Sequence, residues 1–519
     1  MESLDARRDR TIAGLLSDQQ DDGSFGGHPY RKWTGATGGW CRWSNSAFRP
    51  GTAMPFVLAK ACWVGLLRRR RLVIYGSLRP NRDVELVLAC WRFARHLSET
   101  TMVDLDVDRL LQLDSEVLST QRQLEDARAE LKRRSKALGG PAATNEVREA
   151  NRRLREQIQE LEVRHRAAES ARQELLLRVP NPPDASVPYG TSSEENVPVK
   201  HWGERPSFDF PAQDHVEIMQ RLDMVDTERG VRVGGSRGYI LKGWAVFLEQ
   251  VLLRYGFDCI IRHGFAPMRT PSLIRDVGLF GTGQFPRSRE QTYHVTEDDL
   301  YLTGSADAPL TGLHSGEILD HRSLPLKYAA ISPCFRREVG SAGRDVRGVF
   351  RVHEFMKVEQ FVMCVNDRDE SVRWHETMLT YGEEVVQGLE LPYRIVNAVT
   401  EDLGPGHVKM YDLECWIPSE NRYRENYSDS YFLDWQARRA DRRYRDAEGN
   451  VQFVHTLNNT VIATPRILIP FCEVHQQADG SIRIPTALQP YMGIDRISEP
   501  STAGAVGASS SIPVGQVQR

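Results

Sequence analysis

The side chains best suited to chemistry lie in the stretch FRREVGSAGRDVRGVFRVHEFMKVE, from Phe335 to Glu359. We expect FRRE to lie on a strand, whose two-residue period places Arg336 and Glu338 on one face, and the Gly-Ser-Ala-Gly segment lets the chain turn and return with Phe355. A guanidinium fork suits a phosphate under attack by a carboxylate, and an aromatic ring can stack on a purine. Any one of these residues alone would fit a surface salt bridge. Together they predict a nucleotide site.

A second cation follows far downstream, in the stretch HTLNNTVIATPR that ends at Arg466. The apolar run Ile467–Phe471 comes next, so Arg466 opens a buried helical segment. Such a charge is costly unless it meets an anion. Arg466 is therefore a candidate for a second phosphate clamp, although a lone arginine at such a place is more often part of a structural ion pair.

These residues need a scaffold, and the segment 214–497 has the pattern of one. It combines a helix expected from Gly243 to Tyr255 with short β-branched runs such as 328–331 and 361–365, separated by many Gly and Pro turns. We expect an α+β domain with an antiparallel sheet flanked by helices. A linker is expected at 179–213, after the helix-breaking Val179–Pro183, and a disordered tail at 498–519.

The segment 102–178 has a different, heptad pattern. Leu110, Val117, Leu124, Leu131 and Leu138 recur every seven residues, and a second heptad series from Val147 to Leu175 follows Gly139-Gly140-Pro141. This pattern predicts an antiparallel coiled-coil hairpin with a polar outer surface. By itself, such a hairpin is more often a dimerisation or scaffold device than an RNA-binding arm.

Composition sets the remaining bounds. The 519 residues carry 67 Lys plus Arg against 70 Asp plus Glu, so a nucleic-acid contact would need a local basic face. Eight cysteines without a CxxC pair indicate reduced thiols and a cytoplasmic protein. The apolar run 53–67 is too short and interrupted to span a membrane. Residues 1–101 are either an extension of unknown role or the product of a wrongly chosen start, with Met102 as the alternative.

Together, FRRE, the spacing from Arg351 through Phe355 to Glu359, and the ATPR that ends at Arg466 resemble the second and third motifs of class II aminoacyl-tRNA synthetases. The helix after Gly243 and HGFAPMRTPSLI, with Pro271, resemble the first motif, which the family places at its dimer interface. VPNPPDASVPYG, LFGTGQFP, GSAGRDVRG, YDLECWIP, DWQARR, HTLN and ALQPYMG narrow the resemblance to the seryl-tRNA synthetases over roughly residues 103–497.

The resemblance implies a homodimeric serine--tRNA ligase that uses ATP and Mg2+, acts on L-serine and tRNA(Ser), and grips the tRNA with its N-terminal coiled-coil arm. Arg336 would hold the α-phosphate and the reacting carboxylate, and Arg466 the γ-phosphate; these two are the catalytic residues. Glu338 and Phe355 would read adenine, and Glu425 with Ser428 would lie at the metal. The full ATP-binding set is Arg336, Arg337, Glu338, Val352, His353, Glu354, Phe355, Glu425, Asn426, Tyr427, Ser428 and Arg466.

The same resemblance implies an amino-acid pocket in which Glu359 accepts the serine hydroxyl. Its expected residues are Ser305, Ala306, Asp307, Arg336, Glu359, Asn458 and Thr460. The arm would contact tRNA shape and backbone through Arg128, Lys132, Arg133, Arg152, Arg153 and Arg155.

Several pocket positions depart from the family pattern. Ser305-Ala306-Asp307 replaces Thr-Ala-Glu, which withdraws the carboxylate by about 1.5 Å. Asn459-Thr460 stands where Gly-Ser is usual, and Tyr427 and Tyr431 stand in the altered stretch that follows Glu425. These residues and Asp307 are expected to cluster where the amino acid binds. Two interpretations follow: charging of tRNA with serine, or a divergent paralogue that activates a serine analogue or uses a non-tRNA acceptor.

Overall fold

The computed structural model describes residues 106–137, 145–339 and 348–499. All of them belong to the second of two compact units, Leu97–Arg519. The expected extension 1–101, the turn at 139–141, the glycine-rich loop at 340–343 and the tail beyond residue 499 lie outside the described residues.

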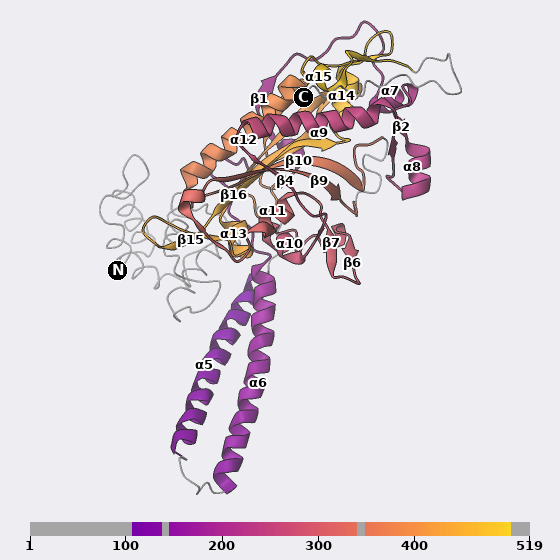
Figure 1. Ribbon diagram of the computed structural model, residues 1–519. Helices are drawn as coiled ribbons and strands as arrows, with labels where there is room; N and C mark the ends of the chain where they lie inside the picture. The colour runs from indigo at the N-terminus through magenta and orange to yellow at the C-terminus, as the bar shows by residue number, and fades with distance from the viewer. Residues whose placement is uncertain (1–105, 138–144, 340–347, 500–519) are drawn as a thin grey trace, which may run out of the picture. The chain divides into compact units, whose positions relative to one another are not determined.

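Two long antiparallel helices, α5 (Val107–Ala137) and α6 (Asn145–Leu176), form the arm (Figure 1). α5 begins after Asp106, whose carboxylate accepts the backbone N–H of Arg109 at 2.8 Å and so caps the helix. The described heptad positions lie at the seam between the helices, where the buried side chains are Leu113, Val117, Leu124, Ala127, Ile158, Leu161 and Ala168. The seven-residue repeat thus provides the apolar contact that holds the pair together.

An eight-stranded sheet organises the segment after the arm. In spatial order its strands are β1 (Val197–Trp202), β11 (Tyr393–Asn397), β12 (Lys409–Ile417), β13 (Arg422–Leu433), β16 (His455–Thr464), β10 (Glu354–Cys364), β9 (Leu326–Phe335) and β4 (Ala266–Arg269). Neighbouring strands are antiparallel except β4 and β9, which are parallel. The expected helix-flanked antiparallel sheet of an α+β domain is confirmed.

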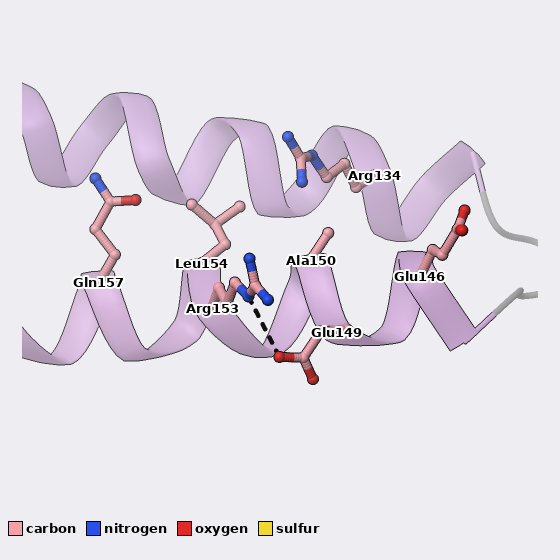
Figure 2. A pocket seen from close by; sticks show the side chains of 7 residues that line it. All are labelled: Arg134, Glu146, Glu149, Ala150, Arg153, Leu154 and Gln157. Atoms are coloured by element: carbon pink, nitrogen blue, oxygen red, sulfur yellow. Dashed lines mark hydrogen bonds and ion pairs between the residues drawn. The ribbon is translucent and has the colours of Figure 1, made fainter.

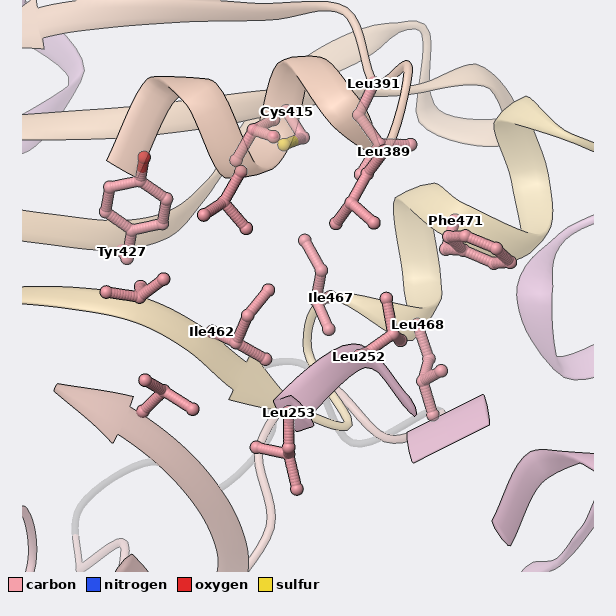
Figure 3. Close-up of a cluster of buried hydrophobic side chains, with 14 of the residues drawn as sticks. Leu252, Leu253, Leu389, Leu391, Cys415, Tyr427, Ile462, Ile467, Leu468 and Phe471 are labelled. Atoms are coloured by element: carbon pink, nitrogen blue, oxygen red, sulfur yellow. The ribbon is translucent and has the colours of Figure 1, made fainter. Parts of the chain in front are cut away.

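One face of the sheet is covered by helices and holds the main core. α9 (Trp244–Arg262) and α12 (Arg368–Gly388) lie against it, with α14 (Leu468–Val474) and α7 (His215–Arg221) nearby. Leu248, Leu252 and Cys259 recur at helical spacing on α9 and are buried. α9 runs seven residues beyond the expected end at Tyr255, because the apolar pattern continues through Ile260. Figure 3 shows part of this core.

The other face carries a smaller core around Phe361 and Met363 of β10. α11 (Asp307–Leu313) and α13 (Trp435–Arg439) pack there, while α10 (Asp276–Thr282) contacts both helices. The remaining elements are β2 (Val225–Asp226), α8 (Thr227–Gly234), β3 (Ile240–Leu241), β5 (Leu273–Ile274), β6 (His294–Val295), β7 (Leu300–Leu302), β8 (Ile318–Asp320), β14 (Arg443–Arg445), β15 (Val451–Phe453), β17 (Ile482–Arg483), α15 (Gln489–Met492) and β18 (Arg496–Ile497).

The segment 179–213, expected as a linker, contributes to the fold. Its strand β1 forms one edge of the main sheet, where Pro198 is tolerated because an edge strand does not need every N–H. Asn181 is buried and donates to the carbonyl oxygens of Gly406 and Phe432 at 3.1 and 2.9 Å. Asn181 near the start of this segment and β1 in its interior are therefore both fixed to the sheet.

Among the described residues, no helix has the length and apolar character needed to cross a membrane. The cysteines in the same ranges are buried free thiols.

Candidate functional site

The hairpin of β9 and β10 brings the expected nucleotide residues together. Arg336 N–H donates to the carbonyl oxygen of His353 at 2.9 Å, and His353 Nδ1 lies 2.9 Å from the carbonyl oxygen of Arg336. These two contacts fix the ends of β9 and β10 to each other. The Arg336 guanidinium carbon lies 5.3 Å from the Phe355 ring centroid. Arg336 is exposed. A cation beside an open aromatic ring suits a phosphate next to a purine.

β9 ends at Phe335, so the expectation that Arg336 and Glu338 share one face of a strand is wrong. Arg337 donates to the carbonyl oxygen of Glu290 at 3.2 Å, and Glu338 has a φ of 51° with its carboxylate 3.5 Å from Arg351. Glu354 is exposed, whereas Val352 is packed in the main core. Val352 can thus meet a ligand only through its backbone.

Arg466 and Glu425 meet across 41 residues of sequence, with Nη1 and Oε1 3.1 Å apart. The Arg466 guanidinium also lies 4.9 Å from the Phe350 ring centroid. Thr464 pairs with Met356, the neighbour of Phe355, so Arg466 leaves the sheet at the same strand end as the Phe355 ring. The two motif arginines thus lie at one end of the β10–β16 pair.

Glu425 and Ser428 lie on β13 beside a buried carboxylate that the motifs did not single out. Asp412 of β12 pairs directly with Ser428 across the two strands. Its Oδ1 is buried without a hydrogen-bond partner among the described residues. Burial, and then the nearby Glu425 carboxylate, raise the Asp412 pKa well above its usual value. An orphaned oxygen beside a carboxylate and a hydroxyl fits Mg2+, which prefers oxygen ligands. Within the described ranges, no group of three or more His, Cys, Asp or Glu side chains is placed to hold a metal alone.

The expected amino-acid pocket centres on Glu359, which is 2% exposed. Its Oε2 lies 3.2 Å from the Ser305 hydroxyl and 3.4 Å from the Thr460 hydroxyl. The Lys357 ammonium contacts both Ser305 Oγ and Glu359 Oε2. Burial raises the Glu359 pKa, and Lys357 opposes that rise.

Asp307 is the first residue of α11, two residues after Ser305. Its Oδ1 is buried and accepts no hydrogen bond from any described residue, and its charge acts on Glu359 and His407. Ala306 is fully buried in the smaller core, so it positions its neighbours by packing. Asn458 pairs with Phe361 and Ser430, which places it on the same face of the sheet as Glu359 and Thr460.

Three of the unusual residues lie on the other face of the sheet. Asn459 donates to the carbonyl oxygen of Met378 on α12 at 2.9 Å, Tyr431 lies 5.0 Å from the His375 ring, and Tyr427 belongs to the main core (Figure 3). Our expectation that these residues cluster at the amino acid is therefore wrong, and the Tyr427 side chain does not face the nucleotide. Strand alternation explains this: Ser428 and Ser430 point one way, while Tyr427 and Tyr431 point the other.

On the arm, most expected tRNA-contact residues are exposed but already paired with carboxylates. Arg128 lies 2.7 Å from Glu162, Arg133 2.6 Å from Glu130, and Arg152 2.7 Å from Glu149. Figure 2 shows a hollow between the two helices near the arm's tip, where Arg153 points to Glu149. No partner is recorded for Lys132 or Arg155 among the described residues, and both are exposed. The basic side chains are thus interleaved with acids and do not form a continuous patch.

Lys357 and Asp412 were missed by the sequence reasoning. The signal for Lys357 was present, since residues 355, 357 and 359 of one strand share a face, and two of them had been assigned to the site. Asp412 had only a weak signal, because its position depends on the pairing of β12 with β13.

Two family models match the chain: the tRNA synthetase class II core domain (G, H, P, S and T) over residues 292–475, and the seryl-tRNA synthetase N-terminal domain over residues 92–183. With the antiparallel sheet and the two motif arginines at one end of the β10–β16 pair, they define a class II aminoacyl-tRNA synthetase.

Comparison with similar proteins identifies which class II synthetase family the chain resembles. A serine--tRNA ligase of Deinococcus radiodurans is 46% identical over 395 residues, which cover 75% of this chain and 92% of that protein. A crystal structure of seryl-tRNA synthetase from Pyrococcus horikoshii complexed with ATP has 37% identity and a TM-score of 0.70, covering 76% of this chain and 93% of that one. The cytoplasmic serine-tRNA ligase from Naegleria fowleri in complex with AMP has 31% identity and a TM-score of 0.68, covering 79% and 95%. The chain belongs to the seryl-tRNA synthetase family.

Proposed function

We propose that this protein activates serine with ATP to seryl-adenylate and transfers the seryl group to tRNA(Ser). The observation that carries the proposal is the continuity of one strand face on β10. Phe355 lies beside Arg336 at the nucleotide end, and Glu359 lies with Ser305 and Thr460 at the other. An adenylate needs this order: base, then α-phosphate, then amino acid. The relatives favour tRNA charging over transfer to another acceptor.

The chain's charges suit this reaction without a protein nucleophile. Arg336 would neutralise the α-phosphate as the serine carboxylate attacks it, and Arg466 would hold the γ-phosphate of the leaving pyrophosphate. Asp307 would take the serine ammonium on its unpartnered oxygen, and Glu359 would accept the hydroxyl. A buried acceptor left unpaired disfavours analogues without a hydroxyl.

A Mg2+ ion would be held with the phosphates by Glu425 and Ser428, with Asp412 behind them. When bound, it would neutralise triphosphate charge and keep the leaving group oriented. Arg466 would then release Glu425 from its present ion pair and turn to the phosphate.

The protein would act as a cytoplasmic homodimer. Pro271 and α9 match the motif that forms the dimer interface in the family, and Val246 and Phe247 of α9 are 41% and 39% exposed. Exposed apolar side chains on one helix favour a buried partner surface. The arm would contact tRNA through its exposed arginines and lysines, once the backbone phosphates displace carboxylates such as Glu149.

The test is ATP–pyrophosphate exchange with each amino acid, followed by charging of tRNA(Ser). We expect exchange with serine and charging of the tRNA, and at least about 100-fold slower exchange in Arg336→Ala and Arg466→Ala. Absence of exchange with any amino acid would overturn the proposal, and near-normal exchange in either variant would contradict the assigned roles. Arg322→Ala, whose side chain is 80% exposed in its pair with Asp320, is the control.

A further inference from the structure

We propose that Lys357 makes the pocket select a hydroxyl over an amine, because it holds Glu359 as half of a neutral pair. The inference rests on the proposed function and deepens it. Its subject is the discrimination between serine and 2,3-diaminopropionate, which differs from serine by an ammonium in place of the hydroxyl.

The first step is the charge of the pocket. Lys357 and Glu359 are 5% and 2% exposed, and the ammonium contacts the carboxylate directly. No other cation is recorded in contact with Glu359 among the described residues. The pair is therefore neutral as a unit, and water does little to screen it.

The second step is how the two acids divide their tasks. Asp307 has a buried Oδ1 without a described hydrogen-bond partner, so it remains available to a cation. The recorded contacts of Glu359, from Lys357, Ser305 and Thr460, all reach Oε2, which leaves Oε1 directed at no described donor. Asp307 thus suits the α-ammonium of the substrate, and Glu359 suits a neutral donor.

The third step is what a second ammonium would meet. An amine at the serine hydroxyl position would have to share the Glu359 carboxylate with the Lys357 ammonium. Two desolvated cations on one carboxylate repel each other strongly, whereas a hydroxyl donates without added charge. Without Lys357, Glu359 would be an unpaired anion, and a cationic side chain would become the better ligand.

The experiment measures pyrophosphate exchange with serine and with L-2,3-diaminopropionate, as kcat/KM for each. We expect the unaltered protein to favour serine by at least about 100-fold, and Lys357→Gln and Lys357→Met to move the ratio by about 100-fold toward diaminopropionate. Lys357→Arg keeps the charge and should keep the preference for serine. Lys327→Met, whose ammonium donates to the carbonyl oxygen of His263 outside the pocket, is the matched control and should leave the ratio unchanged.

Equal use of the two amino acids by the unaltered protein would overturn the inference, whether or not the variants fold. So would a Lys357→Gln protein that still exchanges serine with an unchanged ratio. A generally damaged pocket lowers both values together, whereas loss of charge selection moves them in opposite directions. Failure of the proposed function would look different, since the unaltered protein would then activate neither amino acid.

Discussion

The pair of Lys357 and Glu359 also predicts a specific pattern of stability. Glu359→Gln should destabilise the protein, because the Lys357 ammonium, 5% exposed, would remain buried without its anion. Removing one partner of a buried pair costs about 3–5 kcal/mol. The Gln amide oxygen can still accept from Ser305 and Thr460, so we expect the lower end, about 3 kcal/mol.

That loss converts to a measurable shift in the unfolding temperature. A domain of roughly 300 residues has an unfolding entropy near 0.6 kcal/mol per kelvin, so 3 kcal/mol corresponds to about 5 °C. Lys357→Met/Glu359→Gln carries neither charge and should recover to within about 1 kcal/mol of the unaltered protein. Differential scanning calorimetry of the two single variants and the double variant gives the coupling between the positions.

The Lys357→Met single variant should depend on pH. Burial raises the Glu359 pKa above 4.5, and loss of Lys357 removes the main effect that lowers it. The unfolded carboxyl then loses its proton at a lower pH than the folded one, so stability falls as pH rises above 4.5. The variant should be less destabilised at pH 5 than at pH 8.

A matched control comes from an exposed pair. Arg422 and Glu420 have side chains 58% and 35% exposed, so Arg422→Gln should cost less than about 1 kcal/mol. If Glu359→Gln were as mild as this control, or if the double variant lost the sum of the two single losses, the buried pair would not have the energetic role assigned to it.

Three further predictions concern other buried groups. Arg439→Ala should lower the free energy of unfolding by about 2–4 kcal/mol in a thermal melt, since the Arg439 guanidinium donates to the carbonyl oxygens of Leu177, Phe280 and Phe285 at 3.0, 2.8 and 3.1 Å. The stability of Arg439→Lys should lie between those of Arg439→Ala and the unaltered protein. Burial lowers the pKa of His475 from 6.5 to about 4, so stability should fall as pH drops from 6.5 to 4, by about 3 kcal/mol at pH 4, and His475→Asn should flatten this part of the thermal pH profile. Burial raises the pKa of Asp429 well above 3.8, so the folded carboxyl keeps a proton that the unfolded one loses. The stability of Asp429→Asn relative to the unaltered protein should therefore rise as the pH is raised from 5 to 8. An equal stability difference between the two proteins at pH 5 and at pH 8 would refute the assignment.

The predictable parts of the fold were those encoded locally. The heptads of the arm place their apolar residues on one stripe of each helix, and the buried seam at Val117, Leu124, Leu161 and Ala168 needs no long-range information. The β9–β10 hairpin could be predicted for the same reason, since its strands are close in sequence. The strand β1 could not, because Val197–Trp202 becomes a strand only by pairing with β11, almost 200 residues away.

Some residues of β13 were assigned to the wrong face of the sheet, because the alternation of side chains between the two faces was not applied along the whole strand. Tyr427 and Tyr431 stand in a stretch that also contains Ser428 and Ser430, and both tyrosines are assigned from the sequence to the amino-acid pocket. A strand divides such a stretch between two faces, so every second residue faces α12 and the main core. The same rule, applied to β10, would have added Lys357 to the site, since it lies between Phe355 and Glu359 on their face.

Alternation alone still could not have built the pocket, because β-bulges interrupt it at two places in the site. Val358 pairs with Ile462 but Glu359 pairs with Thr460, so Val461 is bypassed. Without this bulge Glu359 would lie opposite Val461, and the Thr460 hydroxyl would have no part in the pocket. A second bulge between Leu413 and Glu414 bypasses Asn426 and shifts Glu425 relative to Ser428. Bulges re-aim individual side chains and are frequent next to active sites. The residue types of this site can thus be found from the motifs, while its geometry depends on pairings between strands distant in sequence.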